Sequence, residues 1–142
     1  MMAATESRVA AYWTLPARGA LLGLCGAIVA VAGLHWPLEN QSRRGLALFL
    51  ALTACVYPGA LLAQSVPLAA AVAETLVGAV VFACAWLAFP FGSIWLTIGY
   101  ALHGGWDWLH HVHLVPTRVS AWFPPACAVF DFVIAAYALA VT

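Results

Sequence analysis

The sequence predicts an all-α fold, a polytopic transmembrane helical bundle of about five spans. Of its 142 residues, 65% are hydrophobic and only 7% are charged, whereas soluble domains carry about 25% charged residues. Several apolar runs approach or exceed the length of about 20 residues that a helix needs to cross the hydrocarbon core. The seven tryptophans fall near the ends of these runs, as the aromatic belts of a bilayer require. We therefore expect residues 1–142 to form a single integral membrane domain in contact with the lipid bilayer.

Charge and cysteine content exclude several other classes of protein. The formal net charge is zero, the sequence contains no lysine, and its five arginines occur singly or in one pair. No basic patch for nucleic acid is present, so we expect no nucleic-acid partner. The four cysteines lie far apart in apolar runs, which excludes a disulfide framework and a CxxC metal motif.

The N-terminal part of the chain predicts one tail and one span. Residues 1–16 are mixed in character and are interpreted as a short tail, and residues 18–36 form the first span. Gly19 and Gly23 make a GxxxG pair, extended by Ala27, which is typical of a helix face that packs closely against a neighbour. A cleavable signal peptide is the alternative for this segment. Cleavage of this segment would leave four spans. Four spans would also result if the last span only dips into the bilayer.

The middle of the chain predicts two spans. Residues 37–44 are the most polar stretch and are expected to form a loop. The second span covers residues 45–64, and Pro58 near its middle should kink the helix. The third span, residues 67–90, follows a tight turn.

Two further spans complete the bundle. The fourth covers residues 94–111 and the fifth covers residues 126–142, and the proline-containing segment 113–125 between them is interpreted as a re-entrant or interfacial loop. Five spans place the two termini on opposite sides, here named side A (N-terminal) and side B. Side A carries three arginines and side B two, which slightly favours a cytoplasmic side A by the positive-inside rule.

Four polar residues of three different spans are predicted at similar depth near side A. At 1.5 Å per residue, Glu74 lies about seven residues from side A, His103 about eight, Asp107 about four and Asp131 about five. An ionised carboxylate in hydrocarbon costs at least about 2.5–3.5 kcal/mol. These side chains should therefore face the bundle interior and be neutralised by protons, by histidine or by a cation.

The fourth span presents one polar face, because its polar residues fall within about 100° of the helix circumference: Tyr100, His103, Asp107, His110 and His111. His103 and Asp107 are separated by four residues on this face, so both can reach one ion, as paired ligands do in zinc proteins. We therefore predict a site for zinc, iron or manganese, with these metal ligands: His103, Asp107, His110, His111 and Asp131. His110 and His111 are alternatives for one position, and Glu74 could also complete the shell. Asp107 or Glu74 would act as catalytic base.

The spacing of these residues resembles a family of small bacterial integral membrane proteins catalogued as a domain of unknown function. Two linked patterns within residues 95–138 support the resemblance: His103-x3-Asp107-x2-His110-His111 and Trp122-x-Pro124-x2-Cys127-x3-Asp131. The resemblance implies a bacterial inner-membrane protein and implies no activity. The first pattern also resembles the His-x3-His and His-x2-His-His boxes of membrane fatty-acid desaturases and hydroxylases, with aspartate in place of the expected histidine at position 107. In residue types alone, the site is similar to the zinc sites of membrane hydrolases of the alkaline ceramidase and adiponectin-receptor type.

Three functions are consistent with these features, and the sequence does not decide whether the protein is an enzyme. The first is metal-assisted hydrolysis or oxidation of a lipid-like substrate. The second is a proton-linked transporter or channel subunit that uses Asp131, Glu74 and His103 as a relay. The third is an accessory subunit of a larger membrane complex, in which the polar cluster only packs. The small size favours this third function or a homo-oligomer.

Overall fold

The computed structural model describes the backbone of residues 2–34 and 39–140 and the side chains of residues 16–33 and 42–140. All regular elements in these ranges are helical, which confirms the predicted all-α class. They are α1 (Met2–Leu34), α2 (Glu39–Thr53), α3 (Val56–Ala60), the short 3-10 helix η1 (Leu61–Ala63), α4 (Leu68–Phe91), α5 (Ile94–His111) and α6 (Phe123–Ala140).

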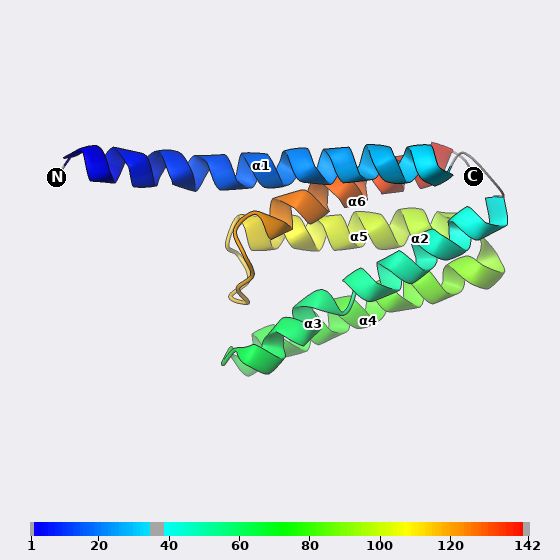
Figure 1. Ribbon diagram of the computed structural model, residues 1–142. Coiled ribbons are helices and arrows are strands. Elements are labelled where there is room, and N and C mark those ends of the chain that lie inside the picture. The colour runs from blue at the N-terminus through cyan, green and yellow to red at the C-terminus, as the bar shows by residue number, and fades with distance from the viewer. Residues whose placement is uncertain (1, 35–38, 141–142) are drawn as a thin grey trace.

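The helices pack in a spatial order that differs from their order along the chain. α1 packs on α6, α6 on α5, α5 on α4, and α4 on α2 and α3, as Figure 1 shows. The chain runs back and forth between two ends of the bundle. The α3–α4 turn and the α5–α6 connection therefore lie at the end where α1 begins, which is side A.

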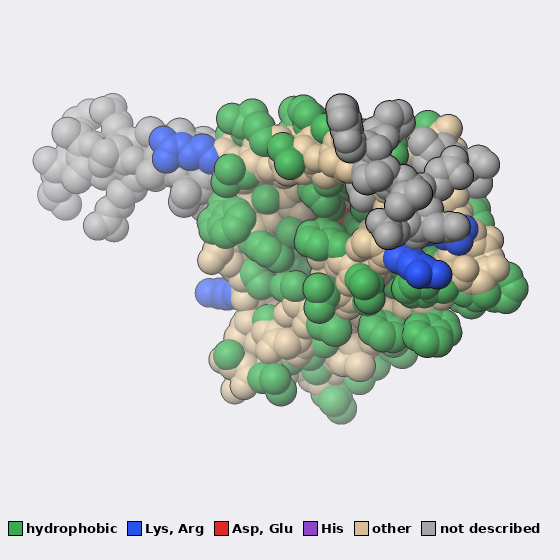
Figure 2. All heavy atoms as spheres, turned by 45° about the vertical axis from the view of Figure 1, so that its right-hand side comes forward, with side chains coloured by type: hydrophobic (Ala, Val, Ile, Leu, Met, Phe, Trp, Pro, Cys, Tyr) green, Lys and Arg blue, Asp and Glu red, His purple; other side chains and the backbone are tan. Residues whose placement is uncertain are grey.

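Four helical segments in the described residues are long and apolar enough to cross a membrane: Pro16–Gly33, Ser42–Ala63, Leu68–Phe91 and Phe123–Ala140. The outer surface agrees with this, since large apolar side chains such as Leu52, Leu62 and Trp86 are exposed. Figure 2 shows arginine side chains toward the two ends of the bundle and mainly hydrophobic side chains between them. Helix α5 is less apolar because it carries the His/Asp stretch, and it packs between α4 and α6.

Two boundaries differ from the sequence-based expectation. Residues 1–16 were expected to form a tail, but the backbone is helical from Met2 onward and continues through Pro16. Alanine, glutamate and arginine are good helix formers, and their favourable helix propensity offsets the loss of the single hydrogen bond that proline removes. Residues 37–44 were expected to form a loop, but Glu39 already begins α2. An acidic residue is favourable at a helix N-terminus because of the helix dipole.

The predicted kink in the second span is present. Helix α2 ends at Thr53, and α3 begins at Val56 after a two-residue break. Pro58 causes this, because it has no N–H to donate to the carbonyl of Ala54, four residues before it. Helix α4 passes close to the break at Gly78, where a Cβ would lie 2.8 Å from the Ala54 carbonyl oxygen.

The GxxxG face of the first span packs as predicted. Gly19 and Gly23 lie directly against the backbone of Trp122 and Ala126, so that any Cβ at either glycine would collide with it. Ala27, one turn further along, is fully buried. Helices α1 and α6 can therefore approach each other backbone to backbone.

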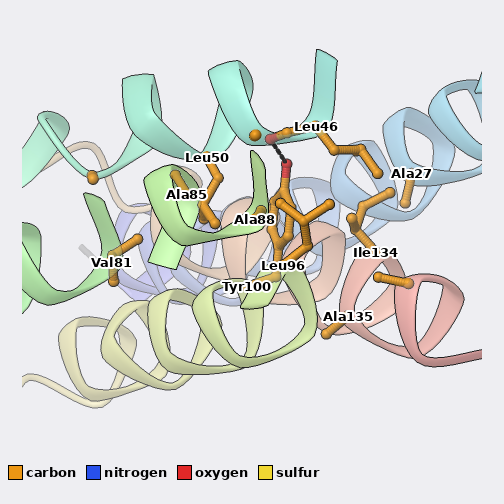
Figure 3. Packing of buried hydrophobic residues seen from close by; sticks show 13 residues of the cluster. Ala27, Leu46, Leu50, Val81, Ala85, Ala88, Leu96, Tyr100, Ile134 and Ala135 are labelled. Carbon is orange, nitrogen blue, oxygen red and sulfur yellow. Dashed lines mark hydrogen bonds between the residues drawn. The ribbon is translucent and has the colours of Figure 1, made fainter. Parts of the chain in front are cut away.

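The half of the interior near side B is filled by a hydrophobic cluster, part of which Figure 3 shows. Its largest buried members are Leu50, Leu96, Tyr100 and Ile134. The Tyr100 hydroxyl donates a hydrogen bond of 2.8 Å to the Leu46 carbonyl, which satisfies the one polar group that Tyr100 brings into the cluster. The buried acids and histidines lie in the other half, nearer side A.

Candidate functional site

The four residues predicted at one depth are all buried. The exposed fractions of Glu74, His103, Asp107 and Asp131 are 1%, 3%, 0% and 1%. They come from α4, α5 and α6, as the depth argument required. The structure divides them into two clusters, however, and this division was not predicted.

The first cluster, here called the HDD cluster, comprises His103, Asp107 and Asp131. Nδ1 of His103 lies 2.6 Å from Oδ2 of Asp131 and 3.1 Å from Oδ2 of Asp107. One potential ligand atom from each of the three residues lies within 4.8 Å of the other two. Gly104 permits this approach of α5 to α6, since a Cβ there would lie only 3.1 Å from the Cβ of Asp131.

The other nitrogen of the His103 ring defines its tautomer. Nε2 lies 3.2 Å from the carbonyl oxygen of Thr53, and a carbonyl can only accept a hydrogen bond. Nε2 therefore carries its proton and donates it. Thr53 is the last residue of α2, where helix carbonyls have no partner within the helix, so the kink supplies the acceptor for His103.

Tyr57 is a site residue that the sequence did not single out. Its hydroxyl donates a hydrogen bond of 2.5 Å to Oδ1 of Asp107, and the residue is 2% exposed. The other carboxylate oxygen, Oδ2 of Asp107, is buried and makes no hydrogen bond with any described residue. The signal available in the sequence was the position of Tyr57, directly before Pro58 in the middle of a span.

The second cluster is formed by Glu74, Trp106 and His110. One oxygen of Glu74 lies 2.9 Å from Nε2 of His110, and the other accepts a hydrogen bond of 2.8 Å from the indole N–H of Trp106. Nδ1 of His110 lies 3.0 Å from the backbone carbonyl of Trp106. Tyr57 links the two clusters, because its ring stacks on His110 with 3.8 Å between ring centroids.

His111 lies apart from both clusters. Its ring is 5.5 Å from that of Trp108, and it lines an open cavity together with His113. Among the described residues, the group that could hold a metal ion is the HDD cluster. Of the five predicted ligands, the structure thus brings three together, while His110 faces Glu74 and His111 faces the cavity.

The fold and the site together define a class: a helical protein with membrane-spanning apolar helices and a buried His/Asp group that could hold a metal ion. The model of a family of unknown function, DUF6010, matches residues 18–142. The chain belongs to this family, and the expected membership of an uncharacterised family is confirmed. No curated protein and no solved structure matches the chain.

Proposed function

We propose that this integral membrane protein binds a divalent metal ion between His103, Asp107 and Asp131. The observation that supports the proposal is the orientation of the His103 ring. Nε2 donates to a backbone carbonyl, and Nδ1 faces two carboxylate oxygens. Histidines that bind metals usually donate their second N–H in this way. If Nδ1 carries a lone pair, three such atoms at these separations repel one another unless a cation lies among them.

Charge balance favours a divalent metal over a proton. A neutral imidazole and two carboxylates around a divalent ion have a net charge of zero. A single proton on Nδ1 would instead leave one negative charge uncompensated in a buried site, where the effective penalty is several kcal/mol, so a metal-free cluster would have to take up a second proton on one carboxylate. The hydrogen-bond and ion-pair partners of these three side chains in the described structure are Thr53, Tyr57 and one another, so no arginine compensates this charge.

The ligand set suits a catalytic metal. One nitrogen and two oxygen ligands fit zinc, iron or manganese, and three protein ligands leave a coordination position for water or substrate. We propose that such a metal supports hydrolysis of a lipid-like substrate by activating water. As the base we propose Asp107 through Oδ1, the oxygen that accepts the hydrogen bond from Tyr57, while Oδ2 faces the metal position. Both oxygens of Glu74 are already occupied by Trp106 and His110.

Proton-linked transport is the second candidate. It is favoured by the link through Tyr57, which contacts both Asp107 and His110 and so joins the HDD cluster to Glu74. The hydrophobic cluster on the side B half would have to open for such a relay to cross the bundle.

For location we propose the bacterial inner membrane, with side A in the cytoplasm. The exposed helix faces would contact lipid, a second copy or a larger complex.

Metal content tests the proposal. Protein expressed with metal supplements and purified in detergent should contain about one zinc, iron or manganese ion per chain by elemental analysis. His103→Ala and Asp131→Asn should lose it. His111→Ala, a change on the same helix but outside the HDD cluster, is the matched control and should retain the metal. Metal-free wild-type protein that is folded, as judged by circular dichroism and gel filtration, would refute the proposal.

A further inference from the structure

An open cavity of about 650 Å³ lies at the side A end of the bundle. The connection between α5 and α6 supplies most of its lining, including His113, Val115, Pro116, Thr117 and Arg118. The cavity therefore combines donors of hydrogen bonds with apolar surface. His110 also lines it, and this residue stacks on Tyr57, which bonds to Asp107. The side A cavity thus adjoins the HDD cluster through two side chains.

His113 lies in the left-handed backbone region, with a φ of 60°. It occupies the position after the C-cap of α5 in a Schellman motif. Its N–H donates to the His110 carbonyl at 3.0 Å, and the next N–H, of Leu114, donates to the Leu109 carbonyl at 3.0 Å. Glycine is the usual residue there, because a Cβ is strained in this conformation. A histidine at this position places an imidazole on the cavity wall at the expense of backbone strain, a pattern common at functional sites.

Arg118 supplies the charged donor of the cavity. The Arg118 N–H donates to Oε1 of Gln64 at 2.8 Å, and Nε2 of Gln64 donates to the Arg118 carbonyl at 2.8 Å. This pair of bonds fixes the backbone that carries the exposed guanidinium. Thr117 is only 4% exposed, and its buried hydroxyl lies near Glu74.

We infer that the side A cavity binds the anionic head group of an amphiphile, a phosphate or a carboxylate, with the apolar chain directed along Val115 and Pro116. A guanidinium binds such groups through paired, charge-assisted hydrogen bonds. Imidazole N–H groups add donors that need no charge of their own. That this amphiphile is the substrate of the metal site rests on the proposed function, whereas binding in the cavity does not require the metal.

Dodecyl phosphate is a suitable probe, with native mass spectrometry from dodecyl maltoside micelles as the measurement. Wild-type protein should bind one molecule per chain, at least about tenfold more tightly than inorganic phosphate or dodecyl phosphocholine. Arg118→Gln should weaken binding about tenfold, the equivalent of one charge-assisted hydrogen bond. Arg44→Gln, an exposed arginine at the opposite end, is the matched control and should bind like wild type.

His113→Gly separates a binding role from a structural one. Glycine relieves the left-handed strain, so the melting temperature should stay equal or rise while dodecyl phosphate binding weakens. The inference is overturned if Arg118→Gln and His113→Gly bind like wild type, if Arg44→Gln weakens binding as much as Arg118→Gln, or if inorganic phosphate binds as tightly as dodecyl phosphate.

The His103→Ala variant distinguishes this inference from the metal proposal. It should contain no metal and still bind dodecyl phosphate with wild-type affinity. If wild-type protein holds metal but binds no dodecyl phosphate, the cavity inference fails and the metal proposal stands. If it binds dodecyl phosphate but holds no metal, the cavity inference stands and the metal proposal fails.

Discussion

Tyr57→Phe is the most informative single change at the HDD cluster. It removes one hydroxyl, the donor of the 2.5 Å hydrogen bond to Asp107. It keeps the ring that stacks on His110 and leaves almost no change in volume. Because Asp107 is 0% exposed, water cannot readily replace the lost donor. The substitution therefore tests one hydrogen bond to one proposed ligand.

Two magnitudes follow from this geometry. Hydrogen bonds to charged groups contribute about 1.5–3 kcal/mol, so the free energy of unfolding should fall by about 2 kcal/mol. Partners that orient metal ligands affect metal affinity by about 10–100-fold. Metal affinity is measured by competition with a chromogenic chelator, and stability by thermal unfolding in detergent. We expect metal affinity to fall by at least about tenfold.

Tyr100→Phe is the matched control. It also removes a buried tyrosine hydroxyl, whose hydrogen bond goes to the neutral carbonyl of Leu46 in the side B half. It should lower stability by about 1 kcal/mol and leave metal affinity unchanged. Wild-type metal affinity in Tyr57→Phe, or an equal loss in Tyr100→Phe, would refute the role assigned to the Tyr57–Asp107 bond.

Two further predictions concern packing and the division of the polar residues. Gly23→Leu should destabilise the fold by more than about 3 kcal/mol, because its side chain must displace the Ala126 backbone. Gly33→Ala, with open space around its Cβ, should be neutral or slightly stabilising, and similar melting temperatures for both variants would contradict this packing. Glu74→Gln should retain the full metal content in elemental analysis, because Glu74 pairs with His110 and not with the HDD cluster. Loss of metal in this variant would show that the two clusters act as one site.

The common depth of the polar residues could be predicted because helix rise and span boundaries determine it. The shared face of His103 and Asp107 followed from helical periodicity within α5. The pairing across helices could not be predicted in this way. Whether Glu74 or Asp131 meets His103 depends on how α4 and α6 are rotated about their axes, and side-chain packing sets that rotation. Hence Asp131 joined the cluster and Glu74 did not.

Only part of what the kink contributes to the HDD cluster could be predicted from the sequence. Pro58 indicated where regular hydrogen bonding would fail, and the break is present. The direction of the bend depends on contacts with α4, above all at Gly78. That direction brings the Thr53 carbonyl to His103 and the Tyr57 hydroxyl to Asp107. Two partners of the site therefore arise from an interruption in a helix that carries none of the proposed ligands.

The one-sided distribution of polar and apolar residues in the interior has a consequence for metal supply. In the described structure, the cavity beside the HDD cluster opens at side A, and hydrophobic side chains fill the half near side B. A metal ion bound by the HDD cluster, as proposed, would therefore be expected to enter from the compartment at side A. Sites with nitrogen and oxygen ligands discriminate modestly among divalent metals, and availability decides which one they hold. The orientation of the chain in its membrane would then determine the metal it carries.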